Sequence, residues 1–229
     1  MISERQEEII KLLVKEYIKS AEPISSKFLA EKYDFGICPS TLRIEFQYLI
    51  KEGFLEQPHT SAGRVPTDKA YRFFVDNLKQ ESEEKIEEEI EEIIKGIKDY
   101  HKIAYSISKY LSSHSSSFTI LNLGEFTIKE GFEEIFKTPE AKDSSFILDI
   151  LTFIKKFEEI QIAPGLYIGE ENPVQNTKTI TLICSECNFP KQKVHISILG
   201  PKRMDYENNI KLINSLNKVL KEIVWRKKN

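Results

Sequence analysis

The sequence is poor in the residues and segments that mark secreted and membrane proteins. It holds one Trp, two Met and three Cys among 229 residues. An odd number of cysteines without a framework-like spacing predicts free thiols rather than a disulfide scaffold. No apolar run reaches the length of a membrane span, and the charged start MISERQEEII lacks the apolar core of a signal peptide. We therefore expect a cytoplasmic protein that does not enter a membrane.

A surplus of either charge is also missing, because 33 Lys and Arg stand against 36 Asp and Glu. The net charge of −3 neither favours nor excludes a nucleic-acid partner, so any DNA-binding surface must be a local patch. The acidic run ESEEKIEEEIEE at residues 81–92 would repel a phosphate backbone and is expected to point away from one.

Patterns that carry catalysis or cofactor binding are absent from the sequence. It has no glycine-rich phosphate loop and no cluster of acids and histidines typical of a catalytic site. The four histidines show no metal-ligand spacing. Cys184 and Cys187 form a lone CxxC, which indicates two small strand residues more readily than a zinc or redox site. We predict no enzyme activity, no cofactor and no metal.

The first 78 residues carry the clearest helical pattern. SERQ at residues 3–6 has the form of a capping box, and apolar residues then recur on one face to about Lys19. A short second helix is expected from Ser25 or Ser26 to Tyr33. A third helix opens at Pro39 and ends near Gly53.

The third helix is predicted to expose a row of side chains that can reach DNA. Leu42, Phe46 and Leu49 mark its buried side. The residues assigned to the major groove are Ser40, Thr41, Arg43, Ile44 and Gln47. On an arbitrary helix, a surface of this kind is more often simply solvated.

The segment after the third helix favours the DNA-binding interpretation. Residues 54–66 predict a β-hairpin, in which FLEQ and VP are strands around the turn PHTSAGR. Three helices and a hairpin make a winged helix-turn-helix, whose third helix enters the major groove. We expect Thr60, Ser61 and Arg64 of the wing, together with Lys27, to contact phosphates or the minor groove. A winged helix can instead serve as a protein-docking module.

Between Ile86 and Leu111, apolar residues alternate in steps of four and three, which is typical of a coiled-coil seam. The set comprises Ile86, Ile90, Ile93, Ile97, Tyr100, Ala104, Ile107 and Leu111. The pattern predicts a long helix that either pairs two chains or packs on its own domain, and neither alternative is favoured. Gly96 counts against a continuous helix, because Gly costs about 1 kcal/mol relative to Ala.

The C-terminal part predicts an α+β domain. Helices are expected over residues 144–159 and 206–225, and strands in GLYIG, TKTITLICSEC and QKVHISILGP. The last two strands form a hairpin about NFPK. GPKRMDY at residues 200–206 is interpreted as a turn that packs the final helix, with a partner surface as the alternative.

Four segments closely resemble the heat-inducible transcription repressor family, HrcA: EPISSKFLAEKYDFGICPSTLRIEF, LEQPHTSAGRVPTDKAYRFFVD, GLYIGEENP and GPKRMDYENNI. The resemblance implies a winged-helix domain at residues 1–78 and a GAF-like domain at 118–229. Residues 79–117 would be a long helix and Ser-rich linker. Because GFEEIFKTPEAKD comes soon after SSHSSS, much of the family's central region is expected to be missing and the GAF-like domain truncated.

The same resemblance implies a function and partners. Members are dimeric repressors of chaperone genes that bind the inverted-repeat operator CIRCE on double-stranded DNA. The GroEL chaperonin keeps them in the DNA-binding form. Because GAF domains often hold small ligands, a small-molecule sensor remains an alternative.

Two positions depart from the family pattern. Members usually carry Ser in place of Cys38 and Asn in place of Ile44. Loss of the Ser is expected to weaken the helix cap by about 1 kcal/mol. Ile44 offers a thymine methyl contact where Asn would hydrogen-bond, so we expect altered base preference at one operator position.

Overall fold

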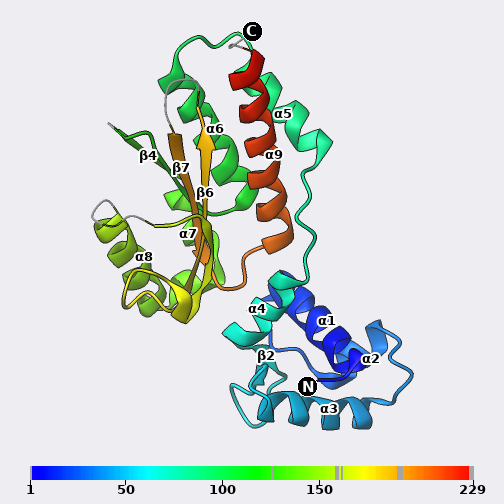
Figure 1. Ribbon diagram of the computed structural model, residues 1–229. Coiled ribbons are helices and arrows are strands. Elements are labelled where there is room, and N and C mark those ends of the chain that lie inside the picture. The colour runs from blue at the N-terminus through cyan, green and yellow to red at the C-terminus, as the bar shows by residue number, and fades with distance from the viewer. Residues whose placement is uncertain (1, 125, 158–159, 161, 190–192, 227–229) are drawn as a thin grey trace. The chain divides into compact units, whose positions relative to one another are not determined.

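The computed structural model describes residues 2–124, 126–157, 160, 162–189 and 193–226. The chain is of the α+β class and divides into two compact units, Met1–Leu78 (unit 1) and Lys79–Asn229 (unit 2). Unit 1 is helical with one small hairpin, and unit 2 is a sheet between two layers of helices (Figure 1). Among the described residues, no helix combines the length and apolar character needed to cross a bilayer.

Unit 1 has the predicted order of elements. Its helices and strands are α1 (Glu4–Ser20), α2 (Ser26–Lys32), α3 (Pro39–Lys51), β1 (Leu55–Glu56), β2 (Val65–Pro66) and α4 (Asp68–Asp76). The capping box is confirmed, since Ser3 Oγ accepts from the Gln6 amide and Gln6 Oε1 accepts from the Ser3 amide. Ser25 and Thr67 cap α2 and α4 in the same way with their hydroxyls.

A buried carboxylate fixes α2 against α1. Glu16 is 4% exposed and accepts hydrogen bonds from Lys32 Nζ and Tyr33 Oη, both at 2.6 Å. Burial by itself raises the pKa of Glu16, but the bonds and charge of its partners outweigh it and leave the pKa lowered. The bond to Glu16 in turn raises the pKa of Tyr33 to about 12. The first two helices are therefore joined by charge as well as by apolar packing.

The hairpin of unit 1 is joined to the segment before α2. β1 pairs antiparallel with β2, and the loop between them returns to Ile24, which exchanges two backbone hydrogen bonds with Arg64 at 2.9 and 2.8 Å. A Cβ at Gly63 would lie 2.5 Å from the carbonyl oxygen of Pro23, so only glycine allows this approach. The loop position is thus set by contacts distant in sequence.

Unit 2 is built on a five-stranded antiparallel sheet with the order β4-β3-β7-β6-β5. Its strands are β3 (Phe118–Asn122), β4 (Thr127–Glu130), β5 (Gly165–Ile168), β6 (Ile180–Asn188) and β7 (Lys193–Pro201). The predicted pairing of the last two strands is confirmed by a register that runs from Ile180 opposite Pro201 to Asn188 opposite Lys193. Residues 190–192 of the predicted turn lie outside the described residues.

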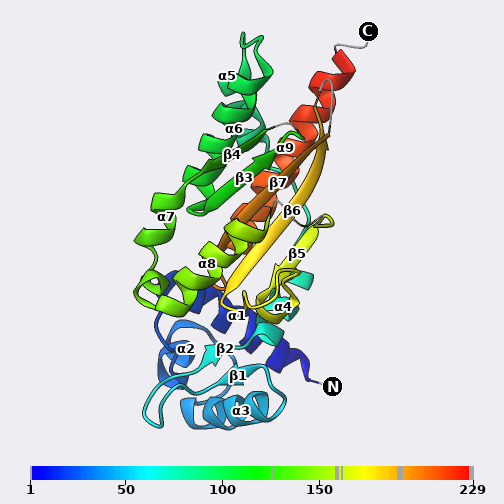
Figure 2. The same ribbon diagram turned by 90° about the vertical axis from the view of Figure 1, so that its left-hand side faces the viewer.

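Helices cover both faces of this sheet (Figures 1 and 2). On one face, α7 (Phe132–Lys137), the turn η1 (Pro139–Lys142) and α8 (Ser144–Lys156) enclose an apolar core with Ile120, Leu182 and Leu199 of the strands. On the other face lie α5 (Glu84–Ile94), α6 (Tyr100–Ser115) and α9 (Tyr206–Arg226). The short turn η3 (Gly169–Glu171) comes after β5. The predictions of α8 and α9 are confirmed; residues 158–159 of the first lie outside the described residues.

The prediction of one long helix between Ile86 and Leu111 is wrong. The segment breaks into α5 and α6, with Gly96 at φ +75° between them and Asp99 capping α6 through the amides of His101 and Lys102. Gly96 adopts the left-handed conformation in which helices commonly end. The helix therefore stops there, although the apolar repeat continues beyond it. The Ser-rich segment is not a linker either, because α6 continues to Ser115.

The apolar stripe of these helices is buried inside unit 2. Most members of the predicted set are at most 9% exposed: Ile86, Ile90, Ala104, Ile107 and Leu111. Ile93, Ile97 and Tyr100 are half-buried. Helix α5 packs against α9 of the same chain. Lys218 of α9 pairs with Glu87 at 2.7 Å across this contact. Of the two alternatives for the stripe, these contacts support packing on its own domain. Strands β3 and β4 lie in a segment for which the sequence analysis predicted no strand.

Candidate nucleic-acid interface

One face of α3 is exposed along its whole length. Leu42, Phe46 and Leu49 are at most 1% exposed, which confirms the predicted buried side. On the opposite side, Ser40, Arg43, Ile44 and Gln47 are exposed and Thr41 is half-buried. Ile44 is the most exposed apolar side chain of this helix, at 69%. The row that the sequence assigned to the major groove therefore shares one accessible surface.

Cys38 begins α3 with a thiol in place of a hydroxyl cap. Its Sγ lies 3.0 Å from Ser40 Oγ and 3.2 Å from Thr41 Oγ1, and its side chain does not cap a backbone amide of the helix. These contacts, of which the bond with Ser40 contributes most, lower the pKa of Cys38 to about 6. Two predicted site hydroxyls are therefore held by an exposed thiol that ionises near neutral pH.

The loop between β1 and β2 is organised by its own side chains. Gln57 Nε2 donates to the carbonyl oxygens of Thr60 and Ala62 at 2.8 and 3.2 Å. The amide of Ala62 donates to the carbonyl of His59 at 2.9 Å, which closes a tight turn. Thr60 and Ser61 are exposed at its tip, in the position that the sequence assigned to them.

Arg64 is placed differently from the expectation. Arg64 is only 7% exposed. Its Nη1 donates to the carbonyl oxygens of Ala62 and Gly63 at 3.0 and 3.2 Å. Nε is buried as well and has no hydrogen-bond partner among the described residues. Burial, and then the charge of Arg43, lower the pKa of Arg64. The guanidinium therefore holds the turn from within.

Lys27 meets the expectation of an accessible cation. It lies on α2 with 77% of its side chain exposed, 3.8 Å from Glu31 one turn further on. Such exposed pairs contribute little to stability, so the ammonium can be transferred to a phosphate at low cost. Sequence reasoning missed Tyr48, which is 39% exposed one helical turn after Ile44. The spacing of four residues from Ile44 was the available signal.

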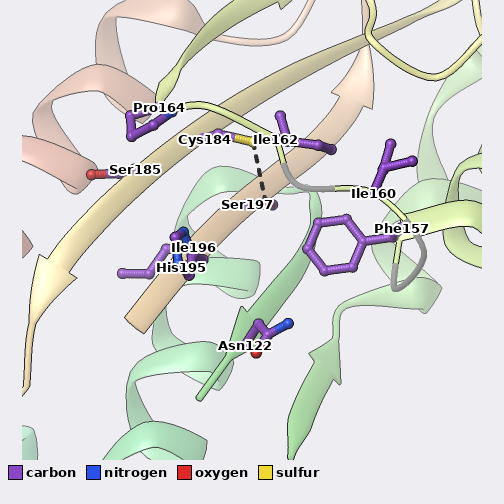
Figure 3. A pocket seen from close by; sticks show the side chains of 10 residues that line it. All are labelled: Asn122, Phe157, Ile160, Ile162, Pro164, Cys184, Ser185, His195, Ile196 and Ser197. Carbon is purple, nitrogen blue, oxygen red and sulfur yellow. Dashed lines mark hydrogen bonds between the residues drawn. The ribbon is translucent and has the colours of Figure 1, made fainter. Parts of the chain in front are cut away.

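Unit 2 contains a small pocket that bears on the sensor alternative (Figure 3). Asn122, Cys184, His195 and Ser197 line it together with apolar residues around Phe157, and Cys184 Sγ lies 3.3 Å from Ser197 Oγ. Its volume is about 70 Å³, whereas pockets for drug-sized ligands run from about 300 to 1,000 Å³. The pocket therefore has room for a few water molecules rather than for a large ligand.

The CxxC cysteines occupy opposite faces of β6. They are three positions apart in a strand, where successive side chains alternate, so Cys184 faces the α8 side and Cys187 the α9 side. Burial raises the pKa of Cys184 to about 11 and that of Cys187 to about 12. Two thiols on opposite faces cannot ligate one ion.

GPKRMDY joins β7 to α9 through buried contacts. Arg203 Nη2 donates to Glu140 of η1 at 3.0 Å, and Asp205 caps α9 through the amide of Asn208. Tyr206 is fully buried and its hydroxyl bonds the carbonyl of Lys202. These contacts support the interpretation as a packing turn.

Fold and site together define a two-unit α+β protein whose helical unit exposes a polar helix face and an ordered hairpin loop. Residues 54–210 match the family described as HrcA protein C terminal domain. The chain belongs to the HrcA family. A solved structure described as that of a hypothetical protein has the same fold, with a TM-score of 0.80, 17% identity and 97% of each chain covered.

Curated relatives carry the name heat-inducible transcription repressor HrcA. The protein of Natranaerobius thermophilus is 37% identical over 152 residues, which cover 65% of this chain and 43% of the relative. That of Brevibacillus brevis is 29% identical over 223 residues, which cover 94% of this chain and 65% of the relative. The chain thus matches less than two thirds of the length of these relatives.

Proposed function

We propose that the chain is a sequence-specific DNA-binding transcriptional repressor of heat-shock genes. In this proposal unit 1 is a winged-helix domain, whose α3 reads the major groove while the β1–β2 loop lies over phosphates or the minor groove. The exposed face of α3 carries the proposal, because Arg43, Ile44 and Gln47 offer charge, a methyl contact and an amide on one side of a rigid helix. The repressor names of the curated relatives support it.

The family resemblance extends the proposal to the operator and partners. The operator is an inverted repeat of the CIRCE type, which two copies of the chain would occupy with their α3 helices. Unit 2 is proposed as a GAF-like domain, through which the GroEL chaperonin would act. No catalytic role is proposed for either unit.

Binding to a CIRCE-type duplex tests the proposal directly. Fluorescence anisotropy at one fixed salt concentration should show binding to this duplex at least about 10³-fold tighter than to a scrambled duplex of equal length. Equal affinity for both duplexes would contradict a sequence-specific repressor. Binding to neither would leave a protein-docking role for unit 1.

Arg43→Ala sharpens this test. Loss of the guanidinium should cost about 1–3 kcal/mol on the operator and should relax discrimination at one base pair. Lys15→Ala is a matched control, because it removes an exposed cation from α1, another helix of the same unit. An equal loss for both variants would show that only overall charge matters.

The small volume of the pocket in unit 2 disfavours the alternative of a small-molecule sensor. A ligand would have to enter the pocket beside Cys184 and Ser197, which holds about 70 Å³. A small molecule that co-purifies with the chain, detected by mass spectrometry after denaturation, would reverse this preference.

A further inference from the structure

Lys69 carries a positive charge at a place where its own helix disfavours one. It lies in the first turn of α4, and the free amide groups at the start of a helix give that end a partial positive charge. Its Nζ donates to the carbonyl oxygen of Glu52 at 2.7 Å and lies 4.2 Å from the centre of the Phe54 ring. The ammonium of Lys69 therefore stabilises the end of α3 rather than the helix to which it belongs.

The end of α3 offers carbonyl groups that suit a cation. Glu52 is the C-cap residue of α3, and the last carbonyls of a helix lack partners within it and carry partial negative charge. The next carbonyl, that of Gly53, accepts from Thr67 Oγ1 at 2.7 Å. The same hydroxyl caps α4 through the amide of Ala70. The start of α4 thus binds two successive carbonyls at the end of α3.

Aromatic rings extend this contact to α1. Phe54 is buried, and its ring meets that of Phe73 on α4 edge-on, with 5.8 Å between the ring centroids. Nζ of Lys11 on α1 lies 5.6 Å from the centre of the Phe73 ring. An ammonium over a ring face is attracted to it. A chain of contacts therefore runs from Lys69 through the two rings to Lys11 and joins the end of α3 to two other helices.

The start of α3 lacks a side-chain cap. Cys38 precedes the helix, and its side chain does not cap a backbone amide. Near the middle of the helix, Glu45 accepts from Gln6 Nε2 of α1 at 2.8 Å. Because two separated points fix the direction of a rigid helix, the bonds of Lys69 and Thr67 at the end of α3 act together with that of Gln6 at its middle.

We propose that Lys69 is a positioning residue for DNA reading by α3. By holding the C-terminal end of the helix, its ammonium sets the direction in which Arg43, Ile44 and Gln47 meet the base edges. Contacts with base edges depend on geometry, so a small change in this direction weakens them. Lys69 acts through α3 and contributes no phosphate contact. This inference rests on the proposed function, because it concerns the same face of α3.

Lys69→Met tests the role, because it removes the ammonium and keeps an unbranched side chain beside the Phe54 ring. The ratio of operator affinity to scrambled-duplex affinity should fall roughly tenfold, the order of magnitude of one hydrogen bond from a charged group. The slope of log affinity against log salt should keep its wild-type value. Lys69→Arg retains a cationic donor and should restore the ratio. Lys15→Met removes an exposed lysine of α1 and should leave the ratio unchanged.

Two results of these titrations would overturn the positioning role. A slope lowered by about 0.9 in Lys69→Met would show that the ammonium contacts a phosphate. An unchanged ratio in the folded variant would show that the bond to Glu52 stabilises unit 1 without directing α3. Urea unfolding identifies the conditions in which Lys69→Met is folded, and the titrations belong in those conditions.

Hydrogen exchange without DNA tests the contact itself. The amides of Gly53 and Phe54 close the end of α3 through hydrogen bonds to carbonyls within the helix. They should exchange faster in Lys69→Met than in the wild type, and unchanged exchange would show that Lys69 does not hold this end. A wild type that binds both duplexes equally would overturn the repressor and the positioning role together. Specific binding by the wild type with an unchanged ratio in Lys69→Met would overturn the positioning role alone.

Discussion

The hydroxyl of Tyr33 donates a 2.6 Å hydrogen bond to the carboxylate of Glu16, which is buried between α1 and the end of α2. Lys32 donates to the other carboxylate oxygen. Because these bonds fix α2 to α1, and α3 packs on α2, Glu16 positions the proposed DNA-reading surface without being part of it.

Glu16→Gln should destabilise unit 1 by roughly 1–3 kcal/mol, because the amide cannot accept two charge-assisted bonds. The lowered pKa of Glu16 means that its stabilisation is present above its ordinary value of 4.5 and is lost as the pH falls through the folded-state pKa. Urea unfolding between about pH 7 and pH 3 should therefore show a smaller acid-dependent loss in the variant than in the wild type. Glu31→Gln, in the exposed pair with Lys27, should leave both quantities unchanged.

Arg64→Ala should weaken DNA binding on all sequences while barely changing its salt dependence. The guanidinium bonds the carbonyls of Ala62 and Gly63, so its loss loosens the loop rather than removing a phosphate contact. Lys27→Ala, at an exposed cation, should instead lower the slope of log affinity against log salt by about 0.9. Anisotropy titrations at several salt concentrations measure both. A full unit of slope lost with Arg64→Ala would show that this residue leaves its buried position to meet DNA.

Ile44→Asn should change the base preference of the protein at one operator position. The exposed side chain of Ile44 suits a thymine methyl, whereas Asn can form two hydrogen bonds with adenine. Affinities across single-base operator variants should shift by about 1–3 kcal/mol at that position and stay constant elsewhere. Tyr48→Phe is a control on the same helix face. An unchanged profile would contradict base contact by this residue.

Cys38 should react with iodoacetamide far below the pH at which the other cysteines react. Its pKa is lowered to about 6, while burial raises the pKa of Cys184 to about 11 and of Cys187 to about 12. Alkylation rates measured by peptide mass spectrometry should therefore rise through about pH 6 for Cys38 alone. Cys38→Ser should also raise the urea midpoint of unit 1, because a hydroxyl caps α3 better than a thiol. Similar reactivity of all three thiols near neutral pH would contradict this description.

Much of the fold was predictable where local signals agree. The capping box at Ser3, the proline that opens α3 and the alternation in β6 and β7 each act through neighbours close in sequence. Strand β3 was not predicted, because its residues 118–121 are all buried and show no alternation of apolar and polar side chains. A short run of this kind cannot be told from the end of a helix by its pattern. The spacing of apolar residues from Ile86 to Leu111 is the same whether the helices pair two chains or pack on their own domain, so the sequence could not decide between these alternatives.

The sequence by itself determined the family, the helices of unit 1 and which face of α3 is exposed, because periodicity and caps are local properties. Only the tertiary structure decided that Arg64 turns inward and that α5 packs on α9. These outcomes depend on what each side chain meets from distant parts of the chain. The guanidinium of Arg64 bonds the carbonyls of its own loop, and the backbone of that loop is held by Ile24 and by the close approach at Gly63.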